Sequence, residues 1–273
     1  YFCSFFFPSF IISGSKIVAC NDDGIFLTND YGQHWDTVSN GFPQYNQFYS
    51  LAAIDTNYFA ATYKGLYQSS GNCNYWSQIN NGLPNTSYIS VTVKGSLIFA
   101  GAKGKGIYLS SDNGNTWAPT NNGLPDSTSV FSFAIGDSII LARLGYGKGI
   151  YYSTDNGANW SVIENNLTSS KLNSLEINGK HIFAKIENMG VFISPDTGKT
   201  WTAVNEGFTD LRIYDLTISG QYLYAAAWNG IWKRKLSEMS GIAENKYNAH
   251  FIFYPNPATL QITIQTQDSK NKE

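Results

Sequence analysis

The sequence predicts an all-β protein, a β-propeller of about six four-stranded blades with a short C-terminal β extension. The first observation is an eight-residue segment ending in Trp that recurs along the chain, with steps of 41, 41, 43 and 41 residues between its Trp positions. The second is that each step holds several short apolar runs separated by turn residues. The third is the composition, with 15% aromatic residues, 14% charged residues and 25 Gly. A fixed step of roughly 40 residues that carries several strands is typical of propeller blades.

Each repeat unit is expected to contain four strands in the same order. In the third unit the first strand is expected over residues 90–93. The second covers residues 97–100, a nearly continuous apolar run that suits a strand buried on both faces. The third strand opens at Gly106 and the fourth begins at Trp117. The last unit ends near residue 235 without the recurring segment, so six blades are expected and seven remain possible, because propellers close their rings.

The two ends of the chain are expected to differ from the repeats. A shift of 41 residues aligns residues 9–24 on residues 50–65, which favours a first strand at residues 7–12 over the remnant of a signal peptide. The propeller is expected to span residues 1–238. A polar linker follows at 239–250, and a separate segment at 251–273.

The recurring segment reads S/T-x-D-x-G-x-x-W in four copies, at residues 28–35, 110–117, 153–160 and 194–201, with a degenerate copy at 69–76. Its Asp can accept backbone N–H groups within a turn, and its Gly can adopt positive φ. Its Trp is expected to insert between layers of the fold and to contribute to stability. The residues expected to have this structural role are Asp30, Gly32, Trp35, Trp76, Asp112, Gly114, Trp117, Asp155, Gly157, Trp160, Asp196, Gly198 and Trp201.

This pattern resembles the Asp box of the bacterial neuraminidase repeat families, which include sialidases, some endoglucanases and photosystem II assembly factors. The resemblance covers residues 9 to about 236. It implies that the boxes lie on hairpins away from the active face, and that their Asp residues are structural rather than catalytic.

The C-terminal segment carries a second resemblance. Tyr254 begins a Tyr-Pro-Asn-Pro stretch, and an alternating Ile-Thr-Ile sequence follows at residues 262–264. This resembles the start of the type IX secretion C-terminal sorting domain of Bacteroidota, although its later strands are missing. The resemblance implies a secreted or cell-surface protein at an outer membrane, with the secretion machinery as a partner. The alternative is a Pro-rich loop before an edge strand.

Composition argues against several function classes. A formal net charge of −2 provides no basic footprint for nucleic acid. The longest apolar run is too short to span a bilayer. No metal or cofactor is predicted, because the Cys and His residues lack ligand spacing at Cys3, Cys20, Cys73, His34, His181 and His250.

The favoured function is a non-catalytic module that binds glycan or protein. The alternative is a glycoside hydrolase, either sialidase-like or endoglucanase-like, and a photosystem assembly factor ranks third. A site resembling that of sialidases needs three arginines, but Arg143, Arg212 and Arg234 are the chain's only arginines, and Arg234 is expected as an edge-strand charge. Other hydrolases need paired carboxylates. No catalytic residue is assigned, although the available carboxylates are Asp22, Asp23, Glu187 and Asp215.

A ligand is expected at one mouth of the channel, where the loops between second and third strands differ from blade to blade. Aromatic planes can stack on sugar rings, and cations favour carboxylate or sulfate groups. The expected ligand-binding residues are Tyr63, Lys64, Lys105, Arg143, Tyr146, Lys148 and Trp228. The competing interpretation is that they are ordinary solvated loop residues.

Overall fold

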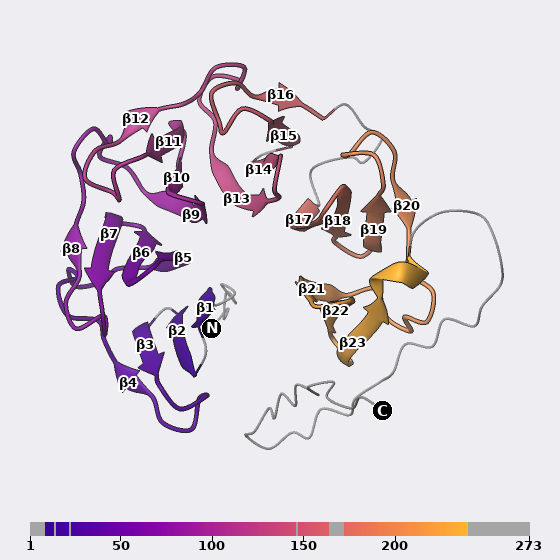
Figure 1. The fold of residues 1–273 in the computed structure, drawn as a ribbon, viewed down its shortest axis with the longest axis horizontal. Coiled ribbons are helices and arrows are strands. Elements are labelled where there is room, and N and C mark those ends of the chain that lie inside the picture. Colours follow the sequence, from indigo (N-terminus) through magenta and orange to yellow (C-terminus); the bar gives the residue numbers. More distant parts are fainter. Residues whose placement is uncertain (1–8, 14, 22, 146, 164–171, 240–273) are drawn as a thin grey trace, which may run out of the picture.

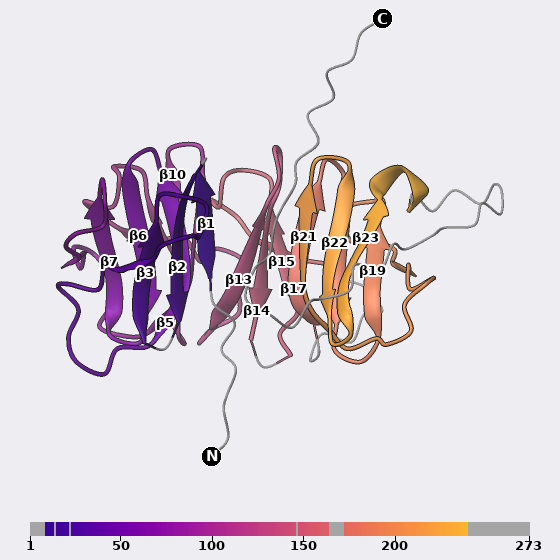
Figure 2. The ribbon, with the colours of Figure 1, turned by 90° about the horizontal axis from the view of Figure 1, so that it is seen from below.

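The structure is a computed structural model, and it describes residues 9–13, 15–21, 23–145, 147–163 and 172–239. These residues form six antiparallel sheets that follow one another along the chain. Figure 1 shows the sheets arranged side by side around a common centre, and Figure 2 shows their strands running between two ends of the molecule. The predicted all-β propeller of six blades is therefore confirmed.

Five sheets contain four strands and the sixth contains three. The strands of sheets 1 to 3 are β1 (Phe10–Ser13), β2 (Lys16–Asn21), β3 (Gly24–Thr28), β4 (Asp36–Thr37), β5 (Phe48–Ile54), β6 (Asn57–Thr62), β7 (Gly65–Ser70), β8 (Ser77–Gln78), β9 (Tyr88–Lys94), β10 (Leu97–Ala102), β11 (Gly106–Ser110) and β12 (Ala118–Pro119). Those of sheets 4 to 6 are β13 (Val130–Ile135), β14 (Ile140–Leu144), β15 (Ile150–Ser153), β16 (Ser161–Val162), β17 (Leu172–Asn178), β18 (His181–Ile186), β19 (Gly190–Ser194), β20 (Thr202–Ala203), β21 (Ile213–Ser219), β22 (Tyr222–Ala227) and β23 (Gly230–Lys235).

Within each sheet the strands pair in sequence order, with the first strand nearest the centre of the ring (Figure 1). The second strands are buried on both faces, as their apolar runs predict. In β6, for example, residues Tyr58 to Thr62 are all buried. Each fourth strand has only two residues, so the outer rim is held by short ladders and by the turns beside them.

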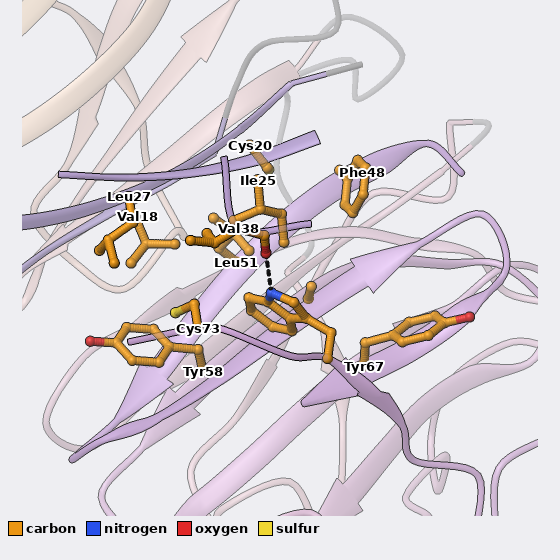
Figure 3. Packing of buried hydrophobic residues seen from close by; sticks show 12 residues of the cluster. Val18, Cys20, Ile25, Leu27, Val38, Phe48, Leu51, Tyr58, Tyr67 and Cys73 are labelled. Carbon is orange, nitrogen blue, oxygen red and sulfur yellow. Dashed lines mark hydrogen bonds between the residues drawn. The ribbon is translucent and has the colours of Figure 1, made fainter. Parts of the chain in front are cut away.

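The core is divided into clusters that lie between neighbouring sheets. Figure 3 shows the cluster between sheets 1 and 2, where Val18, Ile25 and Leu27 meet Leu51 and Tyr58. The next sheets repeat this arrangement, because alternate residues of a strand point to opposite faces and each inner sheet fills two clusters. Packing between neighbouring blades therefore supplies most of the buried apolar surface.

A glycine clamp joins each of the first three blades to the next one along the chain. The segment from a fourth strand to the first strand of the next blade is called the connector. It contains a Gly that lies so close to the next blade's box Trp that a Cβ added to the Gly would meet the backbone oxygen of that Trp. A Cβ added to Gly82 would lie only 2.0 Å from Trp117 O. The N–H of Trp117 donates to Asn81 O at 3.0 Å. The same contact recurs for Gly41 with Trp76 and for Gly123 with Trp160.

The chain ends differ from the repeats. The first strand begins at Phe10 rather than at Phe7, which lies outside the described residues. Among the described residues the last sheet has three strands and no fourth, and a short 3-10 helix, η2 (Leu236–Glu238), follows β23. Apart from Met239, the expected linker at 239–250 and the sorting segment at 251–273 lie outside the described residues. The described part of the chain contains no helix long and apolar enough to cross a membrane.

Candidate functional site

The two ends of the propeller carry different sets of loops. Tyr63 N donates to Gln47 O at 2.9 Å, which places the hairpin between second and third strands beside the connector. This end is called the connector end. At the other end, Gly71 N donates to Thr56 O at 2.9 Å, which places the Asp-box turn beside the hairpin between first and second strands. This end is called the Asp-box end.

The Asp box forms a closed network of hydrogen bonds. The hydroxyl of Ser110 donates to Asp112 Oδ1 at 2.8 Å and accepts the N–H of Gly114 at 2.9 Å. Asp112 Oδ1 also accepts the N–H of Thr116 at 2.9 Å, and the indole of Trp117 donates to Gly114 O at 3.1 Å. The hydroxyl and the carboxylate thus have their partners within the turn. The bonds of the Ser or Thr hydroxyl and of the backbone N–H to the Asp recur around Asp30, Asp155 and Asp196. The indole-to-Gly bond recurs at Trp35 and Trp201 but not at Trp160.

These hydrogen bonds stabilise the ionised form of each Asp. At the fourth blade the amide side chain and the backbone N–H of Asn159 lower the pKa of Asp155 to about 2. The carboxylate is exposed, so its low pKa comes from local donors rather than from a catalytic partner. Hydrogen bonding within the turn accounts for the chemistry of this residue.

The box Trp residues are not all equivalent. Trp76 is fully buried, and its indole donates to Val38 O of the preceding connector at 2.8 Å (Figure 3). Trp160 likewise donates to Thr120 O at 3.0 Å. The expectation that every box Trp inserts between layers is wrong for Trp35, which is 45% exposed. The reason is that no described sheet precedes the first blade.

Two expected ligand-binding aromatics lie exposed at the connector end beside cations. The Nζ of Lys64 lies 5.4 Å from the ring centroid of Tyr63, and both side chains are exposed. The guanidinium carbon of Arg212 lies 4.7 Å from the ring centroid of Trp228, which is 63% exposed. A cation over an aromatic face is held by the ring quadrupole, so each pair offers a positive charge beside an accessible apolar plane.

The other expected ligand-binding residues do not form one cluster with these pairs. Lys148 is engaged within its own blade, because its Nζ donates to Asp126 O at 2.7 Å. Arg143 is half-buried, lies 4.9 Å from the Phe131 ring centroid, and has a pKa lowered to about 10 by burial, so it stays charged at neutral pH. Lys105 is exposed, and Tyr146 lies outside the described residues.

Arg212 is a residue of this end that the sequence analysis considered only as one of three arginines for a sialidase-like site. Its Nε donates to both carboxylate oxygens of Asp210, at 3.0 and 2.9 Å, and its Nη2 donates to Asp210 Oδ2 at 2.5 Å. This fork fixes the guanidinium plane over Trp228 and raises the pKa of Arg212. The Asp-x-Arg spacing was the available sequence signal, but pairing with Trp228 depends on the fold.

The three arginines have separate partners rather than a shared anion site. Arg143 pairs with Phe131 in sheet 4, and Arg212 pairs with Asp210 in the connector that leads to sheet 6. Arg234 is buried, and its Nη2 donates to Glu206 Oε2 at 3.0 Å. It lies on β23, the outermost described strand of its sheet, as expected of an edge-strand charge, but its side chain is buried rather than exposed to solvent. The Nη2 also donates to the carbonyl of Glu238 in η2, which covers this side of β23 where a fourth strand is missing.

A group of polar side chains lies on the first strands of sheets 5 and 6 and on the second strand of sheet 5. Ser174 and Glu176 are half-buried, Lys185 is buried and Asp215 is exposed. The Ser174 hydroxyl donates to Asp215 Oδ1 at 3.1 Å, and Lys185 Nζ donates to Tyr214 O at 3.3 Å. Burial, with a smaller contribution from the Asp215 charge, raises the pKa of Glu176 to about 7. Of the four carboxylates considered from sequence, Asp215 belongs to this group. Within the described ranges no three His, Cys, Asp or Glu side chains gather as a metal site.

Comparison with known proteins supports the repeat and the fold. The BNR/Asp-box repeat family matches residues 151–162, which is one box and the strands beside it. No curated protein sequence matches the chain.

Three similar solved structures illustrate the range of proteins with this fold. An ancestral GH74 enzyme is 18% identical, with a TM-score of 0.69, and is matched over 89% of this chain and 37% of its own. YCF48 bound to D1 peptide is 15% identical, with a TM-score of 0.67 and coverages of 83% and 78%.

The extracellular domain of a two-component system from B. thetaiotaomicron is 14% identical, with a TM-score of 0.67 and coverages of 83% and 32%. The chain thus spans well under half the length of the GH74 and sensor structures. At these identities the likeness shows the propeller fold alone.

Proposed function

We propose that this propeller is a non-catalytic binding module whose connector end binds an acidic ligand, either a glycan with carboxylate or sulfate groups or an acidic protein surface. The observation that carries the proposal is the exposed Trp228 with Arg212 held over its ring at 4.7 Å by Asp210. A sugar ring or a planar side chain can stack on the free part of the indole while the guanidinium attracts the ligand's negative charge.

The second exposed pair, Tyr63 and Lys64, repeats the same chemistry on another blade. Two such pairs on different hairpins suit an extended ligand better than a small molecule. A binding role is compatible with this fold, since the similar structure of YCF48 is in complex with a peptide.

The proposal is tested by calorimetric titration with sulfated and uronic-acid oligosaccharides in one arm and an acidic peptide in the other. Trp228→Ala is expected to weaken binding at least tenfold, since stacking and the oriented charge are lost together. Tyr75→Ala is the matched control, because Tyr75 is also exposed but lies in the turn between β7 and β8 at the Asp-box end. Binding that is unchanged in Trp228→Ala, or lost in Tyr75→Ala, would refute the proposal.

A charge-driven component should also respond to salt. The Debye length falls from ~10 Å at 0.1 M to ~3 Å at 1 M ionic strength, so attraction by Arg212 and Lys64 should weaken over this range. Affinity that is independent of salt would contradict the role of the two cations.

Half-buried Glu176 and exposed Asp215 favour one second candidate, a glycoside hydrolase. Glu176, with its pKa near 7, could donate a proton at neutral pH beside the carboxylate of Asp215, and paired-carboxylate hydrolysis requires such an acid with a second carboxyl group. Reducing-sugar release from polysaccharides that is abolished by Glu176→Gln would favour this candidate over the binding module.

We propose in addition that the protein is secreted or displayed at the cell surface, with residues 251–273 read by type IX secretion machinery. The support is the Tyr-Pro-Asn-Pro sequence and the extracellular setting of the similar sensor domain. Fusion of residues 251–273 to a reporter in a type IX-secreting bacterium should bring the reporter to the surface. A reporter that stays inside the cell would count against this route.

A further inference from the structure

A serine on or next to the first strand links neighbouring blades at the first three joints. The Oγ of Ser50 donates to Val91 O at 3.2 Å. In the next blade the Oγ of Ser90 donates to Val130 O at 2.9 Å. At the first joint the Oγ of Ser9 accepts a backbone N–H of β5 at 3.0 Å. These contacts, called serine links, tie one inner strand to the next around the centre of the ring.

The second strand holds a small residue opposite the linking serine in blades 2 and 3. The register pairs Ser50 with Ala61 and Ser90 with Gly101. A Cβ on Gly101 would lie 2.2 Å from Ser90 Oγ and 2.7 Å from Val130 O. The serine link therefore leaves little room for a long side chain at this position of the repeat.

Blades 4 and 5 have a long cation at this position instead. The register pairs Ser132 with Arg143 and Ser174 with Lys185. Ser132 accepts the Nε–H of Arg143 at 3.4 Å. Ser174 donates to the carboxylate of Asp215 at 3.1 Å. In two consecutive blades the serine thus binds a side chain, and a positive charge lies one residue from the connector end of the second strand.

The charge of Arg143 has no counter-ion among the described residues, although its side chain is half-buried. The guanidinium carbon lies 4.9 Å from the Phe131 ring centroid, and the Nε donates to Ser132. Within the described part of the chain, Nη1 and Nη2 have no hydrogen-bond partner, and neither nitrogen is fully buried. Because burying a charge without a partner is costly, this open guanidinium fork favours an oxyanion.

Lys185 brings a second cation to the same region. Its side chain is 5% exposed, and its Nζ donates to Tyr214 O at 3.3 Å. Burial lowers the pKa of Lys185, and the carboxylates of Asp215 and Glu187 offset part of this change. The charge of Arg143 lowers this pKa further, so the two cations are near enough to act on one anion.

Bulges in two first strands place aromatic side chains beside these cations. The ladders of β13 and β21 each contain one extra residue near the connector end, Phe131 and Tyr214. A bulge re-aims the side chains around it, and bulges are common beside binding sites. The Tyr214 ring centroid lies 6.5 Å from that of Trp228, and the backbone oxygen of Tyr214 accepts from Lys185. Tyr214 therefore connects the buried cation to the exposed Trp228.

We propose that Arg143 and Lys185 form a subsite for an oxyanion group, a carboxylate or a sulfate ester, of a sugar bound beside β13, β17 and β21 (Figure 1). The inference rests on the binding function proposed above and names the place where the ligand's charge is held. Arg143 makes the main contact, because Lys185 already faces two carboxylates. A sugar is favoured over an acidic peptide, since the rings of Tyr214 and Trp228 offer planes for stacking.

The first test follows the Nε–H signals of the arginines in ¹⁵N NMR spectra of the full chain, which contains only three arginines. Arg143→Lys and Arg212→Lys assign the signals. The probes share one sugar ring: glucuronate, glucose 6-sulfate and neutral glucose. At least one charged sugar is expected to shift the Arg143 signal, and the responding probe identifies the group, whereas glucose should not shift it.

Three results of this titration would overturn the subsite. The first is an Arg143 signal that neither charged sugar moves, and the second is an equal shift with glucose. The third is a shift produced only by a tetra-aspartate peptide, which would assign the region to a protein partner. A shift of the Arg212 signal alone would leave the proposed function in place and refute this subsite.

The second test uses Arg143→Met, which keeps a long side chain against Phe131 and removes the charge. Affinity for the responding sugar should fall roughly tenfold or more, because charged hydrogen bonds are lost. The Tm without ligand should equal or exceed that of wild type, since an unpaired half-buried charge is removed. The matched control is Lys103→Met, which removes an exposed cation of the blade 3 hairpin and should leave affinity unchanged.

Unchanged affinity in Arg143→Met with a lowered Tm would show a structural arginine and would overturn the proposal. An equal loss of affinity in Lys103→Met would show attraction by the overall charge, with the same consequence. An acidic oligosaccharide whose binding is lost in Trp228→Ala but kept in Arg143→Met would support the proposed function and refute the subsite.

Discussion

The glycine clamp predicts a large difference between two substitutions of the same kind. Gly123 has φ of +89°, and a Cβ on it would lie 1.9 Å from Trp160 O, a backbone atom that cannot rotate away. Gly95 has φ of +58°, and a Cβ there would meet nothing within 4 Å. Both Gly123→Ala and Gly95→Ala therefore carry the cost of a left-handed backbone, about 1 kcal/mol. Only in Gly123→Ala does the new Cβ also collide with the backbone oxygen of Trp160.

The difference can be estimated from the bonds at the clamp. Relief of the contact moves the connector by more than 1 Å, roughly the shortfall from an ordinary contact of about 3.4 Å. That shift breaks the hydrogen bonds of Trp160 N to Asn122 O and of its indole to Thr120 O, which are 2.8 and 3.0 Å long. If each lost hydrogen bond costs about 1 kcal/mol, the free energy of unfolding of Gly123→Ala is roughly 2 kcal/mol lower than that of Gly95→Ala.

Thermal unfolding followed by circular dichroism measures this difference. For a chain of this size about 2 kcal/mol corresponds to roughly 4–8 °C in Tm. Equal Tm values for the two variants would show that the connector yields without cost, and would refute the clamp as a source of stability between blades.

Three further predictions concern titrating groups. The folded pKa of Glu176 is raised to about 7, so the stability that this residue contributes is complete below about pH 4 and is lost as the pH rises through 7. In urea unfolding, Glu176→Gln should therefore be as stable as wild type at pH 4 and more stable than wild type at pH 8. The pH dependence of stability has the opposite sign for Asp155, because its folded pKa is lowered to about 2. Asp155→Asn should have a lower Tm than wild type at pH 7, and this difference in Tm should shrink as the pH falls from about 4 to 2. Burial raises the pKa of Cys20 and Cys73 to about 11, so in a Cys3→Ser background a thiol reagent at pH 8 should label neither residue quickly until the protein is unfolded.

The blade number and the strand order could be predicted because they follow from local sequence repeated at a fixed step. The apolar run at residues 97–100 and the turn ending in Trp117 each encode one strand or one reversal. Six copies of the apolar run and five of the turn leave little freedom for another fold.

Side-chain partners across blades and loops could not be predicted in the same way. Lys148 was expected at the ligand site, yet its Nζ donates to a backbone carbonyl, and Arg212 was not expected there, yet Asp210 orients it over Trp228. Arg234 is buried because η2 replaces a strand that the repeat would have supplied. These outcomes depend on where the repeat stops, which no pattern within a unit encodes.

The clamp between the connector Gly and the box Trp is built from backbone atoms, and it recurs at the three joints between the first four blades. A blade therefore places almost no demand on the identity of its neighbour's other side chains. Genes that duplicate or lose one unit keep every remaining joint intact, so blade number can drift in evolution while the loops of each unit diverge. In such a protein the residues at the joints between blades are expected to change little, and new binding specificities are expected to arise in the hairpins.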